Sequence, residues 1–176
     1  MADKVQWNEC TWPRANFEEL RLLCNQYNPQ VVAVQKCQLR KDKIINLTFF
    51  FSGITKPSSG DNATGGVTLY INKSVLFSEI KLDTDLQAVA DRVSAKMTLN
   101  VCNVYLPPSV DENFSDLEHL IEQLPAPFAL IGDFNAHSPL WGDVRQDSRS
   151  EIVEQLLNDY NPVSYTHLTL PTTVPV

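Results

Sequence analysis

The chain of 176 residues has no long apolar run, and its beginning lacks a secretory pattern. A helix that crosses a bilayer needs roughly 18 or more consecutive apolar residues, and no segment approaches that length. The first residues, Met1 to Lys4, do not show the charged and then apolar layout of a signal peptide. We therefore expect an intracellular protein, in the nucleus or the cytoplasm, without a membrane partner.

Cysteines are few, and none is spaced for metal binding. The four are separated by at least twelve residues from one another, with no C-x-x-C pair, at Cys10, Cys24, Cys37 and Cys102. Disulfide frameworks and zinc sites normally show closer or paired spacing. Buried or incidental thiols are the simpler interpretation, and we predict no cysteine chemistry.

Basic residues are also scarce, with 14 Lys and Arg against 21 Asp and Glu, a net charge of -7 and a pI near 4.9. Phosphate binding normally draws on clustered Lys and Arg, so this balance argues against a sequence-independent DNA clamp. The sequence still allows a local group of basic residues at the rim of a binding site. The candidates are Arg14, Arg40, Lys41 and Lys43, for which solvated loops are the simpler explanation.

The remaining composition is that of one globular domain, with 43% hydrophobic and 20% charged residues. Apolar spacing predicts helices over residues 17–27, about 114–124 and about 148–161. Apolar and β-branched runs predict strands over residues 31–34, 67–71, 75–82, 86–93 and 97–105, whereas residues 52–64 are predicted to form a loop. Strands and helices that interleave in this way indicate an α/β protein, a two-layered β sandwich flanked by helices.

The stretch 128–141, F-A-L-I-G-D-F-N-A-H-S-P-L-W, is the most informative segment. Its apolar residues predict a strand, Gly132 allows close backbone approach, and period-two alternation places Asp133 and Asn135 on one face with Phe134 on the other. A carboxylate can accept a proton or bind a metal, and a carboxamide can donate to a phosphate oxygen. An Asp/Asn turn with only local hydrogen bonds is the alternative interpretation.

Gly-Asp-Phe-Asn-Ala-His followed by Pro-Leu-Trp-Gly closely resembles the signature of the endonuclease/exonuclease/phosphatase superfamily. More narrowly, it resembles the apurinic-type endonuclease domain of non-LTR retrotransposons, especially jockey-like elements. Further segments resemble the same family in the same order, namely residues 5–8 with 14–20, 31–35, 65–71 and 103–108. The resemblance covers residues 5 to about 160 and implies the DNase I-like form of the α/β sandwich.

The resemblance also implies a site and a chemistry. Asp133 would orient and deprotonate a water, Asn135 and Asn8 would hold the phosphate, and Tyr105 would stabilise charge on its oxygens. Asp133 and Asn8 would also serve the Mg²⁺ that the family uses. DNA at a target site would be the substrate, and a reverse transcriptase domain would belong to the same full-length polyprotein.

Two further residues are predicted to contact the substrate, His137 and Arg14. His137 could equally be a solvated loop imidazole, and Trp141 could be either a packing residue or a ring that stacks on DNA. Tyr105 at a strand end could be purely structural without the resemblance.

The sequence departs from the family pattern at the position of a metal ligand and in the C-terminal segment. Relatives carry Glu-Thr after the second strand, and that Glu is the principal magnesium ligand, but Lys36 and Cys37 stand there. A charged lysine has no lone pair for a metal, so we expect magnesium affinity to fall. The pattern also ends near Asn161, which predicts a domain over residues 1–161 that lacks its final strands, with their Asp and Ser-Asp-His, and a foreign tail over residues 162–176.

The leading hypothesis is a metal-dependent phosphodiesterase domain, a DNA endonuclease that nicks target DNA for retrotransposition and is impaired in this chain. One alternative is an inactive remnant or pseudogene fragment that retains at most DNA binding. The other is a different phosphodiesterase of the same superfamily.

Overall fold

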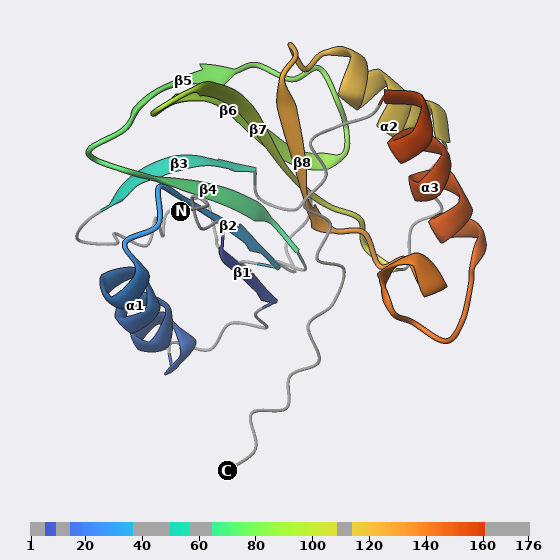
Figure 1. Cartoon of the computed structure of the whole chain (residues 1–176), viewed down its shortest axis with the longest axis horizontal. Coiled ribbons are helices and arrows are strands. Elements are labelled where there is room, and N and C mark those ends of the chain that lie inside the picture. The colour runs from blue at the N-terminus through green and yellow to red at the C-terminus, as the bar shows by residue number, and fades with distance from the viewer. Residues whose placement is uncertain (1–5, 10–14, 37–49, 57–64, 109–113, 161–176) are drawn as a thin grey trace.

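The computed structural model describes residues 6–9, 15–36, 50–56, 65–108 and 114–160, with side chains from residue 18 onward except in the 50–56 strand. Two four-stranded sheets pack face to face, and helices lie on their outer sides (Figure 1). The prediction of a two-layered α/β sandwich is confirmed.

The first sheet has the strand order β1-β2-β4-β3. Its strands are β1 (Gln6–Glu9), β2 (Val31–Gln35), β4 (Val67–Asn72) and β3 (Phe50–Lys56). β1 runs parallel to β2, because α1 (Ala15–Tyr27) provides the crossover between them and lies on the outer side of the sheet (Figure 1). Every residue of β2 and β4 is buried, as the continuous apolar run in β2 predicts for a strand covered on both faces.

The second sheet has the order β5-β6-β7-β8. β5 (Leu76–Ile80), β6 (Gln87–Ser94) and β7 (Thr98–Tyr105) form the predicted antiparallel meander. α2 (Phe114–Glu122) then leads into β8 (Phe128–Asp133), which runs parallel to β7, and α3 (Ser148–Tyr160) follows. Both helices pack on the outer side of this sheet (Figure 1), and all three predicted helices are confirmed within a few residues.

Alternation along the strands divides the core into two layers. One layer lies between the sheets, with Ala33, Leu69, Val89, Val101 and Ile131 among its members. The other lies between the second sheet and α2 and α3, with Cys102, Leu106, Leu120, Leu130 and Val153 among its members. Phe134 belongs to this second layer, which confirms that its ring turns away from Asp133.

The predicted loop over residues 52–64 is wrong for residues 52–56, which belong to β3. Phe50, Phe51, Ile54 and Thr55 favour strand structure, and Ser and Gly between them obscure the pattern in the sequence. The ladder between β3 and β4 shifts register between Ser52 and Thr55, so these small residues lie at an irregularity rather than at the end of a strand.

Asn103 on β7 joins the two sheets. Its side chain is fully buried, and its Nδ2 donates to the carbonyl oxygens of Val34 at 3.1 Å and Thr68 at 3.0 Å. Its Oδ1 accepts a hydrogen bond from Gln35 Nε2 at 2.6 Å. One amide therefore bonds three groups of the opposite sheet.

Replacing Asn103 with alanine is expected to lower the free energy of unfolding by about 2 kcal/mol, because buried polar groups in the first sheet lose their partner. Urea unfolding followed by circular dichroism would measure the loss. An unchanged midpoint would show that the amide does not hold the sheets together.

Candidate active site

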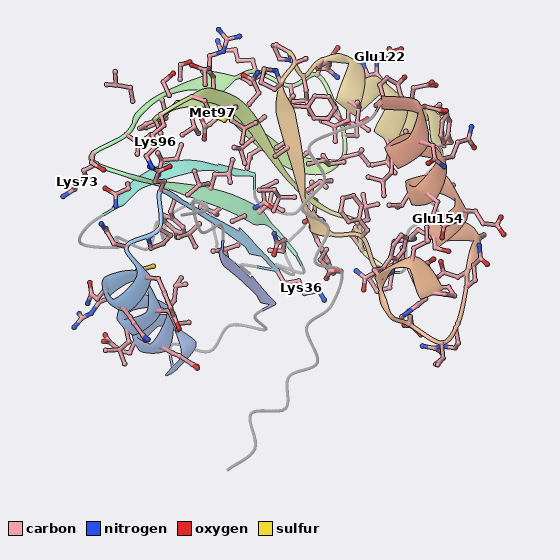
Figure 2. All side chains as sticks on the ribbon, viewed as in Figure 1. Lys36, Lys73, Lys96, Met97, Glu122 and Glu154 are labelled. Carbon is pink, nitrogen blue, oxygen red and sulfur yellow. The ribbon has the colours of Figure 1, made fainter. Side chains whose placement is uncertain are left out.

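Three of the predicted site residues, Tyr105, Asp133 and Asn135, lie together where β7 and β8 end. Tyr105 and Asp133 are the last residues of β7 and β8, and the parallel register pairs them directly. Lys36 follows the last residue of β2 in the opposite sheet. It lies well away from Lys73 and Lys96, which follow the opposite ends of the strands (Figure 2).

Asp133 is held by contacts to both of its oxygens. Its side chain is only 7% exposed, and Oδ2 lies 2.7 Å from Lys36 Nζ. Oδ1 accepts the backbone N–H of Asn135 at 3.0 Å. The Lys36 ammonium also lies 5.4 Å from the centroid of the Tyr105 ring, within the range of a cation–π interaction.

Asn135 lies beside Asp133, but not by simple alternation along a strand. β8 ends at Asp133, and Asn135 has a left-handed backbone with φ +46°. Its Nδ2 donates to the carbonyl oxygen of Leu106 at 2.8 Å. The local turn that the alternative interpretation predicts is therefore present, and it brings the amide to the end of β7.

Of the predicted residues Asn8 and Arg14, the structure describes only the backbone of Asn8. Asn8 on β1 pairs in register with Val34, two residues before Lys36, so its backbone lies at this end of the first sheet. Its side chain lies outside the described part, as do four predicted basic residues, Arg14, Arg40, Lys41 and Lys43. The roles of Asn8 and Arg14 stay predictions.

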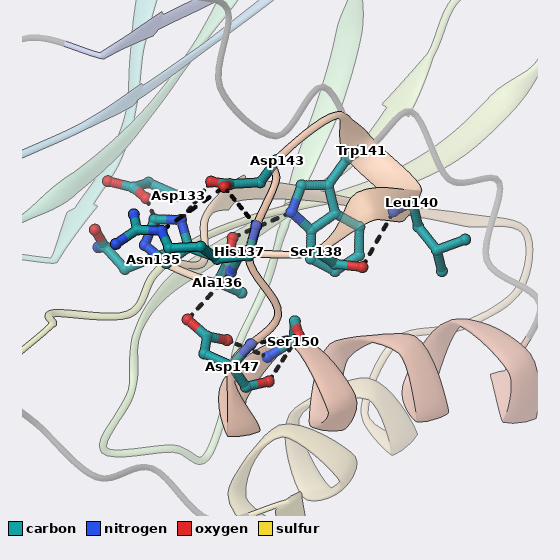
Figure 3. Close-up of polar contacts among 11 residues, drawn as sticks. Asp133, Asn135, Ala136, His137, Ser138, Leu140, Trp141, Asp143, Asp147 and Ser150 are labelled. Carbon is teal, nitrogen blue, oxygen red and sulfur yellow. Dashed lines mark hydrogen bonds and ion pairs between the residues drawn. The ribbon is translucent and has the colours of Figure 1, made fainter.

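His137 belongs to the loop between β8 and α3 (Figure 3). Its Nδ1 lies 2.7 Å from Asp143 Oδ2, and its side chain is 42% exposed. The hydrogen bond to His137, followed by one from the backbone of Arg145, holds the pKa of Asp143 below its usual value. The imidazole is therefore oriented by a carboxylate, while its role toward a substrate stays a prediction.

Asp147 anchors the same loop to α3. One carboxylate oxygen accepts the backbone N–H of His137 at 3.2 Å, and the other accepts that of Ser150 at 2.7 Å, as a helix N-cap does. Trp141 packs against the core and donates from Nε1 to the carbonyl oxygen of Ala136 at 3.1 Å (Figure 3), which confirms the packing interpretation of this ring.

Arg149 is a site neighbour that the sequence analysis does not single out. From the first turn of α3, its Nη1 donates to the carbonyl oxygens of Leu106, Pro107 and Phe134 at 3.1 to 3.4 Å. It thus ties the helix to the ends of β7 and β8. Contacts to backbone carbonyls leave no residue pattern in the sequence, so only an Arg early in a helix hints at them.

Magnesium does not fit the residues that the structure describes. Mg²⁺ requires oxygen ligands in octahedral geometry, yet both oxygens of Asp133 already have partners, one of them an ammonium. Across the described ranges, no three His, Cys, Asp or Glu side chains come together in a way that could hold a metal ion. Among the described side chains, the magnesium that the resemblance implies therefore has no set of ligands.

Comparisons with known proteins agree with the fold and the motif. A family model described as "Endonuclease-reverse transcriptase" matches residues 99–175. The RNA-directed DNA polymerase from mobile element jockey of Drosophila funebris is 27% identical over 143 residues, covering 80% of this chain. Over these residues the chain is similar to the endonuclease–reverse transcriptase family and to a polymerase of a mobile element.

Solved structures show the same fold. The endonuclease domain of TRAS1, a telomere-specific non-LTR retrotransposon, matches with a TM-score of 0.61 at 16% identity, covering 83% of this chain and 65% of that one. An AP endonuclease from Archaeoglobus fulgidus matches with a TM-score of 0.58 at 14% identity, covering 82% of this chain and 66% of that one. The DNase I-like fold is thereby confirmed.

The comparisons also define the extent of the match. The chain spans 16% of the length of the jockey polymerase from D. funebris. The family model reaches residue 175 and so includes most of the segment for which we recognise no resemblance. The domain limits at residue 161 and the foreign tail stay predictions. Where the chain is described, none of its helices combines the length and apolar character needed to span a membrane.

Proposed function

We propose that this chain recognises a DNA phosphodiester in the manner of a retrotransposon endonuclease domain, and that its hydrolytic step is impaired. The contact between Lys36 Nζ and Asp133 Oδ2 at 2.7 Å is the observation that carries the proposal. It puts an ammonium on the carboxylate that would otherwise contact a water. The family relationship supports DNA as the substrate.

The other residues of the site support binding better than hydrolysis. Tyr105 pairs in register with Asp133 at the end of β7, and a phenol can donate to a phosphate oxygen. The Asn135 amide is bonded to the Leu106 carbonyl, so it fixes the turn that follows Asp133. Asp133 and Lys36 together are neutral, which lowers the repulsion between the carboxylate and an approaching phosphate.

We further propose that a reverse transcriptase domain accompanies this one in the full-length polyprotein. The name of the matched family model and the name of the jockey relative both support this. Target DNA would then be the partner of the domain.

Replacing Lys36 with glutamate is expected to raise Mg²⁺-dependent nicking of supercoiled plasmid by at least about tenfold above the unsubstituted protein, whose rate should lie near background. The substitution removes the ammonium and adds a carboxylate beside Asp133. Gel separation of supercoiled and open circular plasmid measures the rate.

Asp133→Ala in the Lys36→Glu background is the matched control and should return nicking to background. Rapid nicking by the unsubstituted chain, lost in Asp133→Ala, would show that the site is not impaired. Circular dichroism would first show that the parent and Lys36→Glu are both folded. If neither of these folded proteins then nicks DNA or retains it at low salt, the assignment to DNA is wrong.

A further inference from the structure

Lys36 adopts a backbone conformation that needs a reason. Its φ is +54°, in the left-handed region that a residue with a β-carbon normally avoids. β2 ends one residue earlier, at Gln35, whose side chain is tied to Asn103 of the opposite sheet. The chain thus turns sharply after a fixed strand end, and this turn delivers the lysine side chain to Asp133.

The ammonium lies in surroundings that suit a cation. Asp133 Oδ2 lies 2.7 Å from it, and the carboxylate is almost fully buried. The Tyr105 ring lies 5.4 Å from it on β7, and a ring face attracts positive charge. Three elements, β2, β7 and β8, therefore contribute to one site for a positive charge, and a side chain of the protein occupies it.

A divalent ion cannot share this place. It would have to contact Asp133 Oδ2, where the ammonium already lies, and two cations at contact distance repel each other strongly. The ammonium supplies no lone pair that could complete a coordination shell. Only displacement of Lys36 from Asp133 would make room.

We propose that Lys36 is a resident cation that takes the place of a divalent metal beside Asp133, so that this end of the sandwich receives a phosphodiester without a metal. The part that concerns phosphodiesters rests on the proposed function, whereas the exclusion of metal does not. The expected ligand is a single nucleic-acid backbone phosphate, which meets a neutral Lys36–Asp133 pair instead of an isolated carboxylate.

Titration with Mn²⁺ alone, followed by electron paramagnetic resonance, tests the exclusion of metal. Lys36→Glu should bind at least about tenfold more tightly than the unsubstituted protein, and Asp133→Asn in that background should remove the gain. If the unsubstituted chain already binds Mn²⁺ as tightly as Lys36→Glu, and Asp133→Asn alone abolishes that binding, the inference is overturned.

Fluorescence anisotropy with a short labelled DNA duplex tests the second part. The unsubstituted protein should bind equally well in EDTA and in Mg²⁺, whereas Lys36→Met should bind several-fold more weakly in both. Lys36→Met with Asp133→Asn removes both charges and guards against misfolding by an unpaired buried carboxylate. Lys73 is an exposed lysine at the opposite end of the first sheet (Figure 2), so Lys73→Met is the matched control and should bind normally.

The outcomes separate the two proposals. DNA binding that requires Mg²⁺ would overturn metal-free recognition. Binding that is unchanged in both Lys36 variants would overturn the role of this residue. If no variant binds DNA but Lys36→Glu gains Mn²⁺, the proposed function fails and the exclusion of metal by Lys36 holds.

Discussion

Replacing Gly132 with alanine is expected to prevent stable folding, with a loss of more than about 4 kcal/mol in the free energy of unfolding. Gly132 lies in β8 directly opposite Val104 of β7. A β-carbon at this position would lie 1.8 Å from the Val104 carbonyl oxygen and 2.8 Å from its carbonyl carbon. Because these are backbone atoms within a sheet, the two strands would have to separate.

Gly142→Ala is the matched control. Gly142 has φ +89°, so alanine would be strained there, but no heavy atom lies within 4 Å of the added carbon. A loss of about 1 to 2 kcal/mol is expected. Soluble yield, far-ultraviolet circular dichroism and urea unfolding would compare the two variants. Equal midpoints for Gly132→Ala and the parent would show that β7 and β8 tolerate a wider separation.

Replacing Asp91 with asparagine is expected to change the free energy of unfolding in a pH-dependent way. The difference between variant and parent should favour the variant by about 3 kcal/mol more at neutral pH than at acidic pH. Asp91 lies on β6 between Val89 and Val93, two residues of the layer between the sheets, and it is fully buried. Neither of its carboxylate oxygens has a hydrogen-bond partner among the described side chains. Burial, followed by the negative charge of Glu79 on β5, raises its pKa to about 6.

The sign follows from the two states of Asp91. The unfolded chain releases the proton near the ordinary pKa of 3.8, whereas the folded chain keeps it until about 6. The contribution of Asp91 to the free energy of unfolding is therefore fully present below the unfolded pKa, and it is lost as the pH rises through the folded pKa. Asparagine does not ionise, so the difference between variant and parent should grow over the same window.

Urea unfolding at about pH 4 and about pH 8 measures this difference, and contributions of other groups cancel between parent and variant. Asp143→Asn is the matched control, because the hydrogen bond from His137 lowers the pKa of Asp143 and its stabilisation is lost only as the pH falls below the ordinary value of 3.8, so its difference from the parent should change little between these two pH values. A pH-independent difference between Asp91→Asn and the parent would show that the carboxylate is not buried in the folded protein.

Much of the fold was predictable because it depends on local pattern. The continuous apolar run in β2 reports burial on both faces, and the spacing of Leu117, Leu120 and Ile121 reports one helix face on a sheet. β3 was missed because its ladder is irregular, and a shift of register between Ser52 and Thr55 places turn-forming residues inside a strand.

The sequence indicated that Tyr105 and Asp133 lie at neighbouring strand ends, but it did not indicate their contacts. The string around Asp133 and the strand end at Tyr105 both mark residues that close a strand, and parallel pairing of β7 with β8 brings these ends together. The bonds of Arg149 to three carbonyls depend on how α3 packs, which no residue pattern records.

The sequence by itself determined that a lysine stands where the resemblance expects a metal ligand, because residue identity needs no coordinates. Only the tertiary structure decided what that lysine does. Its ammonium reaches a buried carboxylate 97 positions away (133 minus 36) because β2 and β8 end at the same side of the sandwich. An ion pair forms only when the two charges lie close together. Residues this far apart in the sequence come close only when the two sheets pack.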